Sequence, residues 1–174
     1  MSFTAKDVKD VARIYMRKEL TDNEVKTILN NGIDQIGGKG LAHGKAEIEA
    51  DKDEWHALPE DVIGPLYVTD ENDNLYNNWQ YLDGKIKFAD KGKYEVVARR
   101  MPKQIESVDE EVDLDRLYKP ALVAYLGGFS KLTDDDHSPD GARLMQNFER
   151  MAAQAFNSLI DSRRPTQVRV FRHG

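Results

Sequence analysis

The sequence contains no cysteine among its 174 residues. This excludes disulfide bonds, thiolate metal sites and cysteine nucleophiles, and it fits a reducing compartment. Long apolar runs are also missing, since no stretch approaches the roughly 18 residues of a membrane span. The first residues lack the apolar core of a secretory signal. We therefore expect a soluble intracellular protein that makes no contact with a membrane.

Acidic residues outnumber basic ones, and the formal charge is −6. The last twelve residues hold four arginines and no acid, so the preceding 162 residues carry 21 basic and 31 acidic side chains, a charge of −10. An acidic body repels phosphate backbones, which argues against sequence-wide nucleic-acid binding. The basic C-terminal segment therefore needs its own explanation.

The N-terminal part predicts two helices. Residues 4–18 have apolar residues at helical spacing behind a Thr4 N-cap. Thr21 and Glu24 have the spacing of a capping box, which opens a second helix. We expect Gly37 and Gly38 to end that helix, so that the two helices form an αα-hairpin.

From about Lys45 to Met101 the apolar period drops towards two, with turn signals every eight to twelve residues, as in short antiparallel strands. Asp83-Gly84 predicts a type I′ hairpin turn. The other predicted strands are 45–50, 54–58, 66–69 and 93–100, with an irregular extended segment between Pro59 and Pro65.

After an acidic linker, residues 106–115, the helical period returns. We expect a third helix that is interrupted near Gly127-Gly128, and a last helix that begins at Ser138-Pro139 and ends near Ser162. The fold prediction is α+β: a four-helix bundle of residues 1–38 and 116–162, an inserted antiparallel β subdomain with the linker, 39–115, and an extended tail, 163–174.

No catalytic or metal-binding motif is recognised. Gly37-Gly38-Lys39-Gly40 follows a helix and lacks the Gly-Lys-Ser/Thr of a phosphate loop. The stretch from Asp134 to His137 lacks the alternation and central glycine of a calcium loop, so we interpret it as a solvated loop. We expect no enzyme activity, no cofactor and no metal, although a dispersed triad stays open.

Aromatic residues gather in the β segment, among many acids. A base-stacking platform or a sugar-binding face is one interpretation. A small subdomain can instead use such rings as its core or as a subunit interface, and we favour this second interpretation. The predicted subunit or tail interface consists of Trp55, Tyr67, Trp79 and Tyr81.

The C-terminal segment is the sharpest feature. It leaves the last helix at Pro165 and alternates valine with arginine and phenylalanine, which favours a strand. Such a segment can add to the sheet edge of a partner, and its arginines suit an acidic groove; a frayed terminus is the alternative. The predicted docking residues are Arg163, Arg164, Val168, Arg169, Val170, Phe171 and Arg172.

The arrangement resembles the head–tail adaptor (connector or neck) proteins of tailed bacteriophages. The likeness is carried by Thr4–Arg13, Asp22–Gly32, Leu58–Val62, Gly92–Val96, Tyr118–Val123 and Ala142–Leu159. The resemblance implies a structural protein of the virion neck, made in the host cytoplasm. It implies a ring of identical copies, commonly twelve-fold, that docks beneath the portal protein, continues the DNA channel without binding DNA specifically, and attaches the tail proteins. The C-terminal segment would then dock onto the portal.

Two alternatives stay open. The protein could be another tail-completion or tail-tube component of the same particles, although tail-tube proteins are dominated by long strands. It could also be a carbohydrate-binding or hydrolytic module that uses the aromatic β segment, for which paired acids in a cleft would be needed.

Overall fold

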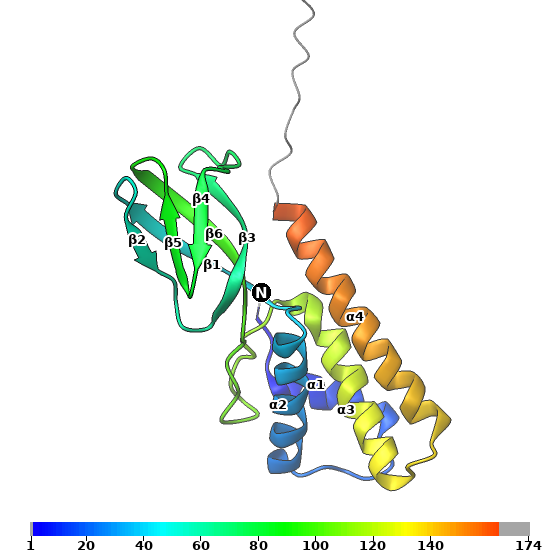
Figure 1. Ribbon diagram of the computed structural model, residues 1–174. Coiled ribbons are helices and arrows are strands. Elements are labelled where there is room, and N and C mark those ends of the chain that lie inside the picture. Colours follow the sequence, from blue (N-terminus) through cyan, green and yellow to red (C-terminus); the bar gives the residue numbers. More distant parts are fainter. Residues whose placement is uncertain (1, 164–174) are drawn as a thin grey trace, which may run out of the picture. The chain divides into compact units, whose positions relative to one another are not determined.

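The computed structural model describes residues 2–163 (Figure 1). The fold is α+β: two N-terminal and two C-terminal helices pack together, and two small antiparallel three-stranded sheets are inserted between them. The chain divides into two compact units. The helical unit contains residues 2–42 and Met101–Ser158, and the β unit contains His43–Arg100 and the described residues from Leu159 onward.

Helix α1 (Ala5–Ala12) begins at a capping box: Thr4 Oγ1 accepts from the backbone N–H of Asp7, and the Asp7 carboxylate accepts from the N–H of Thr4. These hydrogen bonds hold the pKa of Asp7 below its usual range. The prediction of a helix over residues 4–18 is wrong at its C-terminal end. The chain tightens into a 3₁₀ turn, η1 (Arg13–Tyr15), and Met16 is extended, which lets the chain turn towards Thr21.

Helix α2 (Asp22–Gly38) has the predicted capping box of Thr21 and Glu24. As predicted, Gly37 and Gly38 are the last two residues of the helix. The chain leaves the helix through Lys39 and Gly40, and the φ of 65° at Gly40 suits glycine. There the N–H of Gly40 donates to Gly37 O and that of Leu41 to Ile36 O, the two bonds of a Schellman motif.

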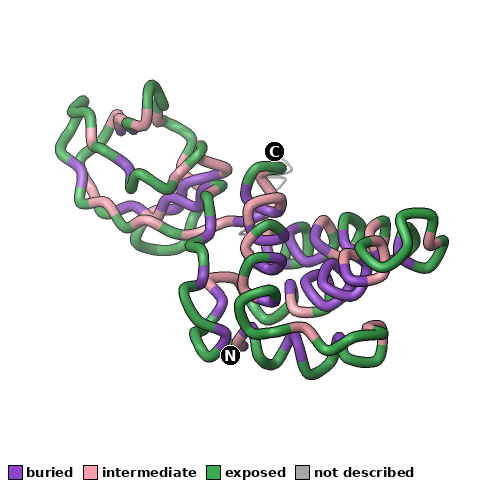
Figure 2. The backbone as a smooth tube through the Cα atoms, turned by 90° about the horizontal axis from the view of Figure 1, so that it is seen from below, coloured by how far each residue is buried: buried purple, intermediate pink, exposed green. Residues whose placement is uncertain are grey.

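Helix α3 (Lys119–Asp134) follows a short 3₁₀ turn, η2 (Arg116–Tyr118), and packs against both α1 and α2. It runs without a break through Gly127 and Gly128, so the predicted interruption is wrong. A Cβ on Gly127 would lie 2.8 Å from the Cβ of Tyr15, and one on Gly128 would lie 3.1 Å from the Cβ of Leu144. The two glycines therefore serve close helix packing. Every residue from Ala121 to Gly128 is buried (Figure 2).

Helix α4 (Pro139–Arg163) begins as predicted, with Ser138 Oγ accepting from the N–H of Gly141 and proline at the first helical position. It packs against α3, where the rings of Phe148 and Tyr125 lie 4.7 Å apart. Its last described residue is Arg163.

The acidic segment before α3 is held to the helical unit at several points. The N–H of Val112 donates to Phe3 O, and the N–H of Lys6 donates to Val108 O. The Asn30 side chain bonds both the N–H and the C=O of Ile105. Residues 101–115, which the prediction placed with the β subdomain, thus lie in the helical unit.

The β unit contains six strands: β1 (His43–Ala50), β2 (Trp55–Ala57), β3 (Val62–Asp70), β4 (Trp79–Leu82), β5 (Lys85–Phe88) and β6 (Gly92–Arg100). They form two antiparallel sheets, in the orders β1-β6-β3 and β2-β5-β4. Strand β3 is longer than predicted and includes Pro65. It tolerates this proline because it is an edge strand whose register shifts on either side of the proline.

Side chains of both sheets share one core, which is centred on Phe88 and Tyr94. Their rings stack with centroids 4.2 Å apart, and Tyr76 lies 4.6 Å from Tyr94. The predicted turn is confirmed, since Asp83 and Gly84 have φ values of 47° and 74° and join β4 to β5.

None of the helices within residues 2–163 combines the length and the apolar composition that crossing a membrane would require.

Candidate assembly surfaces

An apolar groove of about 310 Å³ lies on the helical unit, where α1, η1, α3 and α4 meet. Its apolar lining consists of Val11, Tyr15, Pro120, Val123, Ala124, Leu144 and Met151. Lys119 and Asn147 are the remaining residues of its wall. The groove lies where α1 gives way to the 3₁₀ turn η1, next to α3 and α4.

Large aliphatic side chains are exposed on α1, η1 and the neighbouring turn η2. Ile14 of η1 is 77% exposed, Leu117 of η2 is 50% exposed, and Val11 of α1 is 45% exposed. Apolar groups that gather on a surface often mark an interaction site, whereas single exposed ones are ordinary. Val11 belongs to the groove itself, and Ile14 and Leu117 each lie within a few residues of a lining residue. We call the groove with these two residues the helical assembly surface.

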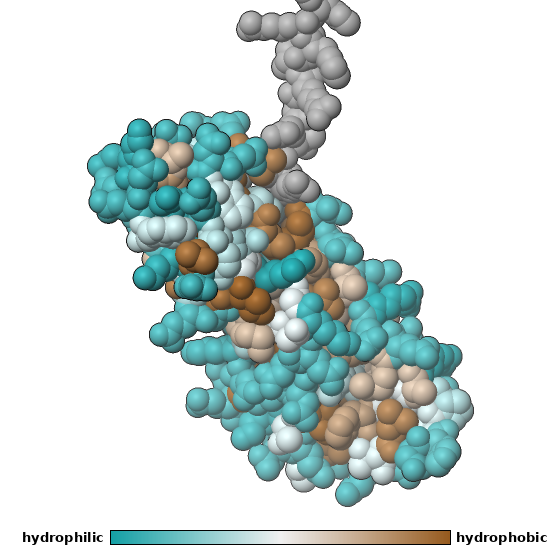
Figure 3. Space-filling view, viewed as in Figure 1, coloured by the Kyte–Doolittle hydropathy of each residue, from teal (hydrophilic) through white to brown (hydrophobic). Residues whose placement is uncertain are grey.

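A second groove, of about 320 Å³, lies between the segment before Thr21 and helices α2 and α3. Leu20, Ile28 and Phe129 supply its apolar wall, and polar or charged residues supply the rest. On the face shown in Figure 3, hydrophobic side chains gather over α3 and are surrounded by hydrophilic ones. The helical unit therefore has two hollows that another chain could fill.

The four predicted interface residues of the β unit do not form one surface. Tyr67 is buried, and Trp79 packs against the core. Tyr81 is exposed, and its hydroxyl donates to Ile63 O. Trp55 is exposed on β2, with the Lys87 ammonium 5.3 Å from its ring centroid. Of the four residues, Tyr67 and Trp79 thus belong to the core or pack against it, while Trp55 and Tyr81 are exposed.

Three other aromatic residues of the β unit are part of its interior. The Tyr76 hydroxyl donates to Asp90 Oδ2 at 2.9 Å, and the Tyr94 hydroxyl donates to Asp90 O at 3.0 Å. Burial raises the pKa of Tyr76 well above its usual value, and the neighbouring side chains of Tyr94 and Asp90 act in the same direction. Phe88 is fully buried between them and the second sheet. All three belong to the aromatic-rich β segment of the sequence, but the sequence alone does not tell which of its rings lie inside.

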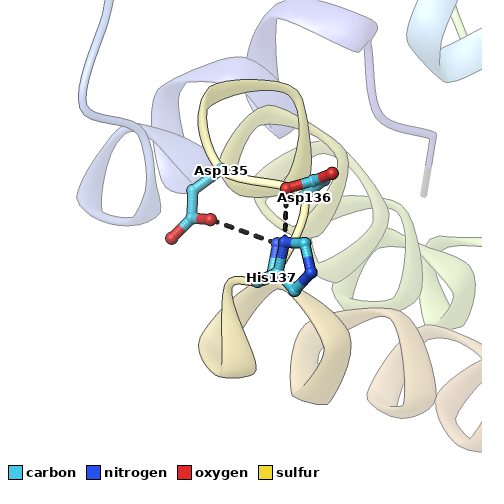
Figure 4. A group of neighbouring side chains, drawn as sticks. All are labelled: Asp135, Asp136 and His137. Atoms are coloured by element: carbon cyan, nitrogen blue, oxygen red, sulfur yellow. Dashed lines mark hydrogen bonds and ion pairs between the residues drawn. The ribbon is translucent and has the colours of Figure 1, made fainter.

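The loop between α3 and α4 brings two carboxylates and an imidazole together (Figure 4). Asp135 Oδ1 accepts from the backbone N–H of His137 at 3.1 Å, and Asp136 Oδ1 lies 2.6 Å from His137 Nδ1. Within residues 2–163, this is the one group of three such residues close enough to share an ion. All three side chains are exposed, and the Asp135 carboxylate already caps the loop backbone. The cluster therefore matches the predicted solvated loop and carries no evidence of a metal site.

The predicted docking residues lie at or beyond the end of the described chain. Arg163 is the last residue of α4. Arg164, Val168, Arg169, Val170, Phe171 and Arg172 lie outside the described residues.

Comparison with protein-family models finds no match, and comparison with curated protein sequences finds none either. The resemblance to head–tail adaptors therefore stays a hypothesis that depends on the chain's own features.

Proposed function

We propose that this protein is a structural component of a tailed-bacteriophage virion, a head–tail adaptor that works by assembly and not by catalysis. In this proposal its copies form a ring beneath the portal protein, continue the DNA channel and present the surface to which the tail attaches. The site of action is the neck of the virion, after synthesis in the host cytoplasm.

The observation that carries the proposal is the helical assembly surface. Ile14 is 77% exposed and directly precedes Tyr15, which lines the apolar groove of about 310 Å³, and exposed apolar surface of this kind is costly in water. A neighbouring copy that covers this surface removes that cost. In a closed ring, every subunit would have its helical assembly surface covered by the next subunit.

Further support comes from the order of the elements, a helix pair, a β insertion and a second helix pair, as the resemblance implies. The finer architecture belongs to the proposal: a four-helix bundle that forms the ring wall, with an extended basic tail that docks onto the portal. The formal charge of −10 outside the tail suits a channel wall that DNA passes without adhering. No described strand exceeds nine residues, which favours an adaptor over a tail-tube component.

Native mass spectrometry of the protein alone and mixed with a portal tests the ring. We expect the parent protein to form closed oligomers, at least on the portal. Ile14→Asp should abolish them because it places a charge in the covered interface, while circular dichroism should show an unchanged fold. Ile63→Asp is the matched control, since Ile63 is an exposed isoleucine of the β unit. Rings that form equally well with Ile14→Asp would refute the assignment of this surface.

Portal docking is tested separately by truncation after Ser162. The truncated protein should keep its fold and lose binding to the portal. Normal binding to the portal would disprove the docking role of residues 163–174 without affecting the ring proposal.

A further inference from the structure

A hollow with a different chemistry lies on the sheet β2-β5-β4 of the β unit. It measures about 280 Å³ and is lined by Asp53, Asn78, Trp79, Gln80, Lys87 and Ala89. These residues come from three segments that meet at one end of the sheet: the turn before β2, the start of β4 and the end of β5. The hollow lies near the lower end of the roughly 300–1,000 Å³ that small-ligand sites occupy.

The register of the sheet places Trp55 on the same face as this hollow. Trp55 pairs with Lys87, and Lys87 pairs with Gln80, so the three side chains leave the sheet on one side. The buried Ile86 and Phe88 alternate with Lys87 and point to the other side, into the core. Trp55 is 43% exposed, with Lys87 against its ring.

Backbone hydrogen bonds hold two of the residues that line the hollow in place. The polar side chains that line it form no hydrogen bond or ion pair with other described residues. The N–H of Asp53 donates to Phe88 O, and the C=O of Asn78 accepts from Ala89 N–H. Among residues 2–163, the side chains of Asp53, Asn78 and Gln80 form no hydrogen bond or ion pair. The Lys87 ammonium has only the Trp55 ring as a contact of this kind in the same part of the chain. A carboxylate, two amides and an ammonium are thus available to a ligand.

We propose that this hollow, with Trp55 beside it, binds a neutral saccharide. Planar amide and carboxylate groups can each bond a pair of sugar hydroxyls, and the ring of Trp55 offers an apolar surface to the C–H face of a sugar. The charges of Asp53 and Lys87 balance, so the hollow needs no charged ligand. A single-stranded nucleic acid could also stack on Trp55, but the acidic composition of the chain opposes its phosphates. This site is separate from the helical assembly surface and does not depend on the proposed ring.

Trp79 lines the hollow, and Trp55, the other tryptophan of the chain, pairs with the lining residue Lys87, so tryptophan fluorescence should report on binding there. The full-length protein is screened on an array of neutral oligosaccharides built from glucose, galactose, mannose and N-acetylglucosamine. The best oligosaccharide is then titrated by fluorescence and by calorimetry, beside a single-stranded oligonucleotide of mixed sequence. We expect saturable binding of the oligosaccharide, with a change in tryptophan emission, and no binding of the oligonucleotide.

Trp55→Ala and Gln80→Ala test the location of the site. Each should raise the Kd at least about tenfold, the factor that matches the loss of one stacking or bidentate contact. Leu82→Ala is the matched control, because Leu82 is exposed on the same strand as Gln80 but does not line the hollow. Circular dichroism confirms that the variants are folded. The proposal is overturned by an array without binding, by a control that weakens binding as much as the two variants do, or by binding of the oligonucleotide in place of the sugar.

Discussion

At the scale of single residues, several glycines matter through the space that they leave. A Cβ on Gly127 would lie 2.8 Å from Tyr15 Cβ, and one on Gly37 would lie 2.7 Å from Pro102 Cδ. Both contacts are far closer than van der Waals packing allows, so a larger side chain would push the elements apart. Gly127 lets η1 approach α3 closely, and Gly37 lets the segment after β6 approach α2 closely.

Gly127→Ala should therefore destabilise the protein, although alanine is the better helix former. Overpacking against the rigid Cβ of Tyr15 costs about 1–3 kcal/mol, more than the helix propensity returns. Gly38→Ala is the control, since nothing lies within 4 Å of its Cβ position and it lies in α2. This second variant should gain about 0.5–1 kcal/mol. Urea unfolding measures both, and equal effects of the two substitutions would show that packing at Gly127 is unimportant.

The same glycines show where sequence reasoning fails. A glycine pair predicts a helix end when only local propensity is weighed. This was correct for Gly37-Gly38, the last two residues of α2, and wrong for Gly127-Gly128, which lie inside α3. At Gly127 the deciding requirement is close contact with the distant Tyr15, which one sequence does not reveal. The capping box of Thr21 and Glu24 and the turn at Asp83-Gly84 were predicted correctly because their physics is local.

At the scale of elements, the acidic segment before α3 behaves as part of the helical unit. Ile105, Val108 and Val112 are buried, while the acids between them face solvent. Asn30 holds the segment at both polar groups of Ile105, at 2.9 Å each. The sequence suggested a linker because acids dominate its composition, and three apolar residues at irregular spacing gave no recognisable period.

Asn30→Ala should release this segment. Two backbone groups of Ile105 lose their partners, and a half-buried unsatisfied group costs about 1–3 kcal/mol. Hydrogen exchange should accelerate in residues 102–112, with little change in β6. Asn31→Ala is the matched control, because the neighbouring Asn31 is exposed. If both variants exchange alike, the hydrogen bonds of Asn30 do not hold the segment.

At the scale of the whole molecule, each unit has its own interior. The helical unit packs around α3, and the β unit packs around Phe88 and Tyr94. The order of helices and strands was predictable because hydrophobic periodicity differs between them. The exposed surfaces were not: whether Trp55 or Tyr67 faces solvent depends on which sheet each strand joins, and the exposure of Ile14 depends on where α1 ends.

Two interiors imply that the units lose stability separately. Phe88→Ala empties the centre of the β core and should cost the β unit about 3–5 kcal/mol. Hydrogen exchange followed by mass spectrometry should then show lost protection across residues 43–100, while Asp22–Gly38 and Lys119–Asp134 keep theirs. Leu82→Ala, at an exposed position of the same unit, should leave both regions protected. Equal loss of protection in α2 and α3 would mean that the chain unfolds as one cooperative body. Retained protection would mean that the helical unit, with its exposed Ile14 and apolar groove, can persist while the β unit opens.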